Sequence, residues 1–261
     1  MFKPTFALTA ALTTLGLTAA GHAAVLVDFD TAADLSDFDA TTNYAHSGSG
    51  GIGGSGGLAV TGDGTVSQYT PETFDLLAAG TKLILTMDGF YDVNVAANAT
   101  LQPAIRAGLT QETNTTMGGT SNMVQASLLA SNSPTAALLQ LDSEDSANLE
   151  SSAITLTDDR WYRLVAEFEA DVSANGVKMS VSVFDIGANG LGTPTQVGST
   201  LSSTLNADTV RGDSTLYAAF KTNRASGVTT LDNFTVVPEP ASLALATLAG
   251  MLMLPRRRNG Q

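Results

Sequence analysis

Residues 161–186 constrain the fold of this 261-residue chain more than any other stretch. In WYRLVAEFEADV, apolar side chains recur at every second position, and Glu167, Glu169 and Asp171 fall on the opposite face. The turn SANG follows, and its Asn-Gly pair suits the positive φ angles of a tight hairpin. VKMSVSVFDI then alternates again, so the segment predicts an antiparallel hairpin with one buried and one wetter face. The face expected to be buried consists of Tyr162, Leu164, Ala166, Phe168, Ala170, Val172, Val177, Met179, Val181 and Val183.

Short segments with strand character fill the rest of the chain between its two ends, separated by Gly, Asn, Asp, Ser and Pro residues. They are 25–30, 82–93, 104–109, 136–141, 152–156, 214–221 and 228–237. No convincing helical period, internal repeat or second domain boundary interrupts them. The sequence therefore predicts one all-β domain over 25–236, an antiparallel jelly-roll β-sandwich of two packed sheets.

The order of these elements resembles the laminin-G and concanavalin-type sandwiches. The resemblance is carried by the strand start WYRL, the Asn-Gly hairpin and a final strand, LDNFTV, and it covers most of 25–237. It implies a concanavalin/laminin-G-like fold, and such folds often bind carbohydrate. The ligand has to be argued from the site, because one fold hosts many functions.

The body of the chain is strongly acidic. Residues 25–237 contain 8 Lys and Arg against 24 Asp and Glu, a net charge of −16. Such a body repels phosphate backbones, so we expect no nucleic-acid partner. Solubility is the simplest reason for the charge, and affinity for cations or avoidance of acidic polymers are the functional ones.

Cysteine and histidine are nearly missing from the chain, which excludes several kinds of site. There is no cysteine, so disulfides, thiolate nucleophiles and Cys-ligated zinc are excluded. Only His22 and His46 occur, and His22 lies in a segment that we expect to be removed. A Ser-His-Asp triad or a His-rich metal site is therefore hard to build.

The N-terminal segment 1–24 has the layout of a secretory signal peptide. Lys3 precedes an apolar stretch, and the small residues Gly21 and Ala23 stand three and one positions before a cleavage point. Cleavage after Ala23 or after Ala24 fits equally well. We therefore expect the protein to be exported.

The C-terminal segment 237–261 combines three features. Pro238, Glu239 and Pro240 lie in the motif 237–240 and predict an extended, protease-accessible stretch. The apolar segment 241–254 has 14 residues, about 21 Å as a helix, which is short for a bilayer core of about 30 Å. A cluster of arginines follows, expected on the cytoplasmic side of a membrane: Arg256, Arg257 and Arg258.

This arrangement resembles the PEP-CTERM sorting signal. The resemblance covers about 25 residues, and the short apolar segment, interrupted by Gly250 and stopped by Pro255, departs from it. It implies export, a transient hold in the inner membrane with the body outside, processing by an exosortase, and a final place at the cell surface or in exopolysaccharide matrix. The export machinery and the exosortase are then partners. A permanent C-terminal anchor is the alternative.

The stretch SGSGGIGGSGG, residues 47–57, contains seven glycines. It lacks the Gly-Lys-Ser/Thr ending of a phosphate loop, and no helix start follows it. We expect a flexible surface loop that borders, at most, a ligand groove.

Glu167, Glu169 and Asp171 present carboxylates about 6.7 Å apart along one strand face, within the range of roughly 5 to 10 Å that a glycosidase pair needs. The run EFEAD distantly resembles the Glu-x-Asp-x-x-Glu strand of laminarinase-type glycosidases, but its acids stand in a different order and the final Glu is missing. An exposed acidic strand face explains the same pattern. On that face, Trp161 and Arg163 are candidates for carbohydrate binding, with packing of Trp161 under a loop as the favoured alternative.

Asp28 and Asp30 lie on the first expected strand, and Asp232 and Asn233 lie on the last. Because terminal strands of jelly rolls commonly lie close together, these oxygens form a candidate structural Ca²⁺ site. Strand-end turns and surface acids are the alternative. No other cofactor is expected.

The sequence thus favours an exported, surface-sorted, non-enzymatic protein with a binding or structural role in extracellular polysaccharide. A concanavalin-fold hydrolase that uses Glu167 and Glu169 is the alternative, and a glycosylated coat protein with a purely structural role is a third interpretation.

Overall fold

The computed structural model describes residues 24–239, except 65, 112–116, 118–121 and 145–149. The predicted signal peptide, apart from Ala24, and the segment from Pro240 onward lie outside the described residues. Within the described part, no helix is long and apolar enough to cross a membrane.

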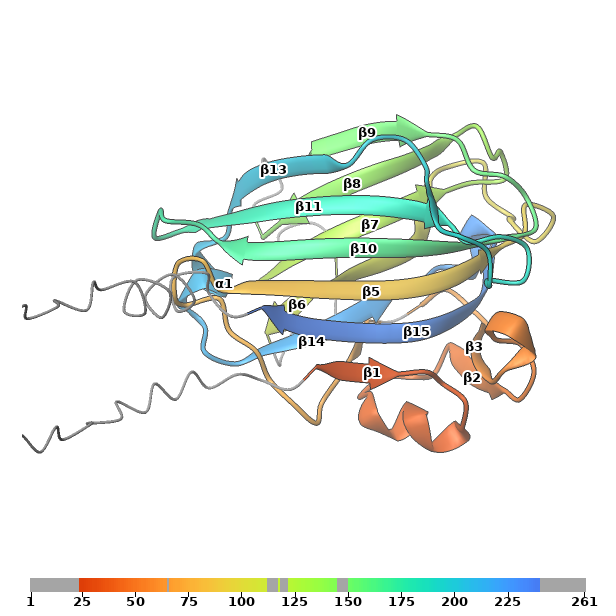
Figure 1. Cartoon of the computed structure of the whole chain (residues 1–261), viewed down its shortest axis with the longest axis horizontal. Coiled ribbons are helices and arrows are strands. Elements are labelled where there is room, and N and C mark those ends of the chain that lie inside the picture. Colours follow the sequence, from red (N-terminus) through yellow and green to blue (C-terminus); the bar gives the residue numbers. More distant parts are fainter. Residues whose placement is uncertain (1–23, 65, 112–116, 118–121, 145–149, 240–261) are drawn as a thin grey trace, which may run out of the picture.

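The described residues form an all-β, antiparallel sandwich, as the sequence predicts (Figure 1). The strands are β1 (Val25–Val27), β2 (Tyr44–Ser47), β3 (Gly57–Val60), β4 (Ser67–Gln68), β5 (Lys82–Tyr91), β6 (Gln102–Gln111), β7 (Met123–Ala130), β8 (Ala137–Ser143), β9 (Glu150–Ile154), β10 (Arg160–Ala170), β11 (Gly176–Asp185), β12 (Thr195–Gln196), β13 (Leu201–Asn206), β14 (Leu216–Lys221) and β15 (Val228–Glu239). The helical turns are η1 (Ala32–Asp37), η2 (Ile52–Gly54), α1 (Asp208–Gly212) and η4 (Arg224–Ser226).

Two sheets make the sandwich. The nine-stranded sheet has the order β12-β11-β10-β5-β15-β3-β2, with β1 paired to β15 and β13 paired to β11. The six-stranded sheet has the order β4-β14-β6-β7-β8-β9 and lies behind it in Figure 1. Each sheet therefore has one face toward the other sheet and one outer face.

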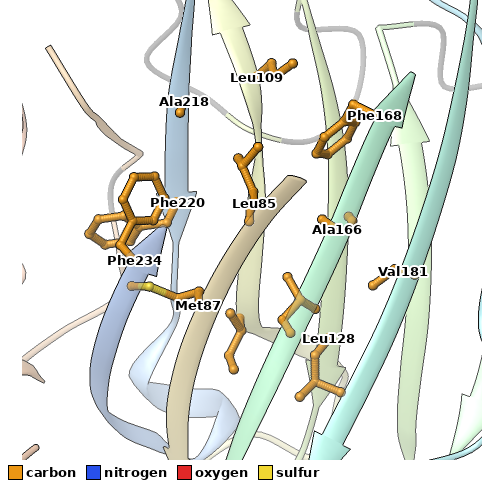
Figure 2. Close-up of a cluster of buried hydrophobic side chains, with 14 of the residues drawn as sticks. Leu85, Met87, Leu109, Leu128, Ala166, Phe168, Val181, Ala218, Phe220 and Phe234 are labelled. Carbon is orange, nitrogen blue, oxygen red and sulfur yellow. The ribbon is translucent and has the colours of Figure 1, made fainter. Parts of the chain in front are cut away.

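The core fills the space between the sheets (Figure 2). Leu85, Ala166 and Phe168 from the nine-stranded sheet meet Leu109 and Leu128 from the six-stranded sheet, and all five are at most 1% exposed. An aromatic group closes one side of this core, formed by Phe29, Phe38, Tyr44, Phe220 and Phe234.

The predicted hairpin is confirmed as β10 and β11, with Ala166 opposite Val181 and Ala170 opposite Val177. One member of its buried face is wrong: Val172 is 87% exposed. The strand ends at Ala170, where the chain turns through 171–175, so the alternation no longer places Val172 against the other sheet.

The other predicted strands correspond to β1, β5, β6, β8, β9, β14 and β15. Two long strands were not predicted. In β7 all eight residues are buried, so it shows no polar-apolar alternation, and β13 is an edge strand with mostly exposed residues.

Candidate functional site

The outer face of the six-stranded sheet is lined with polar residues that are not part of the hydrophobic core. Ile105, Ala107 and Leu109 point inward from β6, so Arg106 and Gly108 point outward, because successive strand residues face opposite sides. The same alternation turns polar side chains of β7, β8 and β14 outward. We call these residues the polar face: Arg106, Gln125, Ser127, Gln140, Asp142 and Lys221.

Strand register aligns these residues into a row. Lys221 lies opposite Arg106, and Arg106 lies opposite Ser127. Ser127 is paired with Gln140, which is paired with Ser151. The row thus crosses five adjacent strands at about 4.8 Å each, roughly 19 Å in all. Lys221 and Gln140 are partly exposed, whereas Arg106 and Ser127 are buried.

Arg106 is held in place by neutral partners. Its Nε donates to Ser127 Oγ at 2.9 Å, and its Nη1 donates to the Met117 carbonyl at 2.7 Å. Burial lowers the pKa of Arg106 to about 10, and the charge of Asp142 opposes this effect only in part. The pKa of Lys221 is also lowered, first by burial and then by the charge of Arg106.

A second row runs beside the first. Gln125 lies opposite Gly108 on one side and Asp142 on the other. Gln125 Nε2 donates to Asp142 Oδ2 at 2.9 Å, while Gln125 Oε1 has no hydrogen-bond partner among the described residues, although Gln125 is fully buried. A buried amide oxygen without a partner is costly, so this atom is available for a donor from outside the described chain.

Small residues occupy the middle of the second row. Gly108 and Ala219 lie opposite each other, and the side chains of Met117, Val66 and Ala219 form a small apolar cluster there. A Cβ on Gly108 would lie 2.2 Å from the Val124 carbonyl oxygen and 2.9 Å from Met117 Cε. Glycine is therefore required for the close approach of β7 and Met117 at this point.

A hollow of about 430 Å³ lies at the end of the second row, lined by Asp39, Gln68, Thr70 and Tyr217. Gln68 connects it to the sheet, because Gln68 Nε2 donates to Thr110 Oγ1 and to the Gln111 carbonyl. The face therefore offers hydrogen-bonding groups at several depths, which is suitable for a hydroxyl-rich ligand.

The outer face of the nine-stranded sheet differs from it. Lys82 Nζ lies 3.1 Å from Glu167 and 3.4 Å from Glu239, and Lys178 Nζ lies 3.1 Å from Glu169 and 3.4 Å from Asp171. Glu167 and Glu169, the two carboxylates of the alternative hydrolase hypothesis, border a groove of about 390 Å³ with Ser180 and Ser202 among its lining residues. Cross-strand ion pairs account for the acids without catalysis.

At the other end of this outer face, the half-buried Arg163 forms an ion pair with a buried carboxylate. Its Nε and Nη2 each donate to the Asp88 carboxylate at 2.7 Å, and Asn233 Nδ2 donates to the same carboxylate at 3.0 Å. Asp88 is completely buried. Trp161 is only 4% exposed and packs edge-on against Phe90, so its ring presents no open face for a sugar. Both carbohydrate-binding candidates therefore have structural roles here.

The glycine-rich stretch 47–57 is anchored to this end of the sheet: Gly51, Gly56 and Gly57 are buried, while Gly53 and Gly54 are exposed. Its backbone N–H groups donate to acids on either side: Gly56 to Asp30 Oδ1 at 3.0 Å and Ile52 to Asp232 Oδ2 at 2.9 Å. A Cβ on Gly56 would lie 2.5 Å from Asp30 Cα. The glycines thus permit close packing, in contrast to the flexible loop expected from composition.

The four residues predicted to bind calcium all make hydrogen bonds within the fold. The terminal strands are adjacent, since β1 pairs with β15, as the calcium argument requires. However, Asp28 Oδ1 accepts the Asp30 N–H, Asp30 and Asp232 hold the glycine-rich stretch, and Asn233 binds Asp88. Among the described residues, the one group of three acids with oxygens within 4.8 Å of one another is Asp92, Asp158 and Asp159.

The predicted boundary between body and sorting signal falls inside a strand. Val237, Pro238 and Glu239 continue β15 and lie opposite Ile84, Leu83 and Lys82. The sandwich therefore extends three residues beyond 236. Pro240, the apolar segment 241–254 and the arginines 256–258 lie outside the described residues.

Sequence reasoning missed the polar face. The available signal was a polar residue at an outward position of an otherwise apolar strand, as in AIRAGL, MVQASLLA and LYAAFK. Single polar residues on separate strands carry no spacing that links them along the chain. Their alignment depends on which strands are neighbours.

The fold is similar to that of legume lectins. The chain matches the structure of lectin UEA-II complexed with galactose at a TM-score of 0.51, with 8% identity over 84% of this chain and 100% of that one. Lectin II from Ulex europaeus gives the same values, and peanut lectin with a nine-residue peptide gives a TM-score of 0.50 with 10% identity, again over 84% and 100% of the two chains. No protein-family model matches the sequence, and a search of curated proteins finds no match either. At these identities the similarity concerns the fold: the body is a lectin-like, concanavalin-type β-sandwich.

Proposed function

We propose that this protein is an exported, non-enzymatic binding protein that holds a polysaccharide against the polar face of its six-stranded sheet. The observation that carries the proposal is the row from Lys221 through Arg106, Ser127 and Gln140 to Ser151. These polar side chains lie on the outer face of the sheet and take no part in the packing between the two sheets. We therefore infer that they have a binding role.

The chemistry of the row supports a saccharide. Amide, hydroxyl and cationic groups donate and accept hydrogen bonds in the way that sugar hydroxyls need. The groups of the row that solvent reaches are Lys221, Gln140 and Ser151. The similarity to lectins, one of them in complex with galactose, agrees with this class of ligand at the level of the fold.

The ends of the chain supply the cellular context of the proposal. Segment 1–24 directs export, and 237–261 sorts the protein through the inner membrane, with an exosortase as the processing partner and the surface matrix as the destination. The intact mass of the protein from its producing cells tests this. A chain that starts near Val25 and ends near Pro240 supports sorting, whereas a chain that retains Arg256, Arg257 and Arg258 means a permanent anchor.

Affinity electrophoresis of the full-length chain in gels that contain a polysaccharide tests the binding function. The variant Gln140→Leu removes a partly exposed amide of the row and should weaken retardation several-fold, whereas Ser180→Ala on the other sheet should not. If no polysaccharide retards the unmodified protein, the proposed function is wrong.

The groove beside Glu167 and Glu169 keeps the hydrolase as a second candidate. Release of reducing sugar from a β-glucan, abolished in the double variant Glu167→Gln/Glu169→Gln, would establish it. No activity in the unmodified protein excludes it for that substrate.

A further inference from the structure

The polar face gathers positive charge in a molecule that is otherwise acidic. The net charge of the chain is −13, and its 12 basic residues are scarce. Two of them, Lys221 and Arg106, lie directly opposite each other on adjacent strands. Like charges at directly opposed positions of an antiparallel pair destabilise a sheet.

Four other cations of the sandwich have carboxylate partners, whereas Arg211 and Arg224 donate to the backbone carbonyls of Ala174 and Val60. Lys82, Arg160, Arg163 and Lys178 all form ion pairs, with N–O distances from 2.7 to 3.4 Å. Among the described residues, neither Arg106 nor Lys221 forms an ion pair. The polar face thus carries two neighbouring positive charges without a direct ion pair, and one carboxylate, Asp142, whose charge acts on Arg106.

We propose that the saccharide bound by the polar face is acidic, and that a ring carboxylate, as in a uronic acid, lies against Lys221 and its neighbour Arg106. This inference rests on the proposed function and names its ligand class. A carboxylate accepts charge-assisted hydrogen bonds from both kinds of cation and relieves the repulsion between them.

Burial strengthens the argument. The pKa of both cations is lowered, chiefly by desolvation, which means that burial destabilises their charged forms. A bound anion would offset part of this destabilisation. Lys221 is partly exposed and makes the direct contact, while Arg106, 8% exposed, acts from beneath.

The acidic surroundings do not prevent this binding. At physiological ionic strength, charges separated by more than about 8 Å are largely screened. The charge of Asp142 raises the pKa of Arg106 in part, and Asp142 Oδ2 also accepts a hydrogen bond from Gln125 Nε2. The one charge that shifts the pKa of Lys221 among the described residues is that of Arg106.

The test measures the affinity of the full-length chain for polygalacturonate, for neutral dextran and for dextran sulfate by isothermal titration calorimetry. Polygalacturonate should bind at least about tenfold more tightly than dextran, with an advantage that shrinks as sodium chloride is raised. Lys221→Met should lose about tenfold on polygalacturonate, and Lys221→Arg should keep most of the affinity. Lys178→Met, which removes a lysine from the other sheet, is the matched control and should bind as the unmodified protein does.

The outcomes separate this inference from the proposed function. Equal affinity for dextran and polygalacturonate, without salt dependence, overturns the acidic ligand and leaves polysaccharide binding in place. Binding of dextran sulfate alone overturns the carboxylate, and equal losses in the Lys221 and Lys178 variants overturn the site. Absence of binding to all three polymers contradicts the proposed function as well. The salt dependence of the unmodified protein decides the question even if Lys221→Met does not fold.

Discussion

On the outer face of the nine-stranded sheet each lysine lies near carboxylates of its own or a neighbouring strand, whereas on the six-stranded sheet Lys221 lies opposite an arginine. The first face neutralises its own charges, and its lysine–carboxylate pairs are partly exposed to solvent. The second face buries polar groups, and at least one of them, Gln125 Oε1, has no hydrogen-bond partner among the described residues. Polar residues on a sheet therefore indicate a binding surface when their partners are incomplete, and a solvated surface when they are paired.

The largest effect is expected at Gly108, where the polar face is most tightly packed. Gly108→Ala places a Cβ 2.2 Å from the Val124 carbonyl, so β6 and β7 must move apart. We expect a loss of about 3–5 kcal/mol in the free energy of unfolding. Urea denaturation measures this loss.

Gly212→Ala is the control for Gly108, because a Cβ there has nothing within 4 Å. Its free energy of unfolding should change by no more than about 0.5 kcal/mol. Similar stability in both variants would mean that the two strands are not in close contact at Gly108.

Next in size is the ion pair between Arg163 and the buried Asp88. Arg163→Ala leaves the fully buried Asp88 carboxylate with Asn233 as its remaining side-chain donor, and should cost about 3 kcal/mol of stability. Saccharide binding should be unchanged once the fold is maintained, because Arg163 lies on the other sheet. Loss of binding without loss of stability in a denaturation curve would restore Arg163 as a ligand-binding residue.

Asp232 should make the stability of this same region depend on pH. Burial raises the pKa of Asp232 to about 6, with Asp88 and Asp30 adding to the effect. The protonated form therefore favours folding. This contribution is fully present below the ordinary pKa of about 4 and is lost as the pH rises through about 6.

The variant Asp232→Asn removes the unfavourable buried charge. Its gain in the free energy of unfolding over the unmodified protein should be about 1–2 kcal/mol larger at neutral pH than at pH 4. Melting temperatures measured across this range check the prediction. Parallel curves for the two proteins would show that Asp232 titrates normally in the fold.

The smallest effect is expected on the ion-paired face. Glu167→Gln/Glu169→Gln removes two carboxylates whose side chains are 40% and 36% exposed, and exposed pairs contribute little. The free energy of unfolding should change by less than about 1 kcal/mol. A loss of stability as large as that of Arg163→Ala would contradict the distinction between the exposed lysine–glutamate pairs and the pair formed with the buried Asp88.

The sequence by itself determined the sandwich and its clearest hairpin, because the period of two in residues 161–186 is a local property that side-chain alternation converts directly into a buried face. It also brought Asp30 and Asp232 into one region, since terminal strands were expected to be neighbours. Their use as acceptors for backbone N–H groups of the glycine-rich stretch required knowing where that stretch folds.

Only the tertiary structure decided the candidate site. Lys221 and Arg106 are more than a hundred residues apart, and their opposition depends on β14 pairing with β6 in one particular register. A shift of one residue would turn Lys221 toward the core. No local sequence feature specifies that register. It is specified by the burial of Phe220 and Leu109 on the inner face, because packing between the two sheets fixes which side chains face inward. The same packing therefore decides which polar groups lie side by side on the outer face.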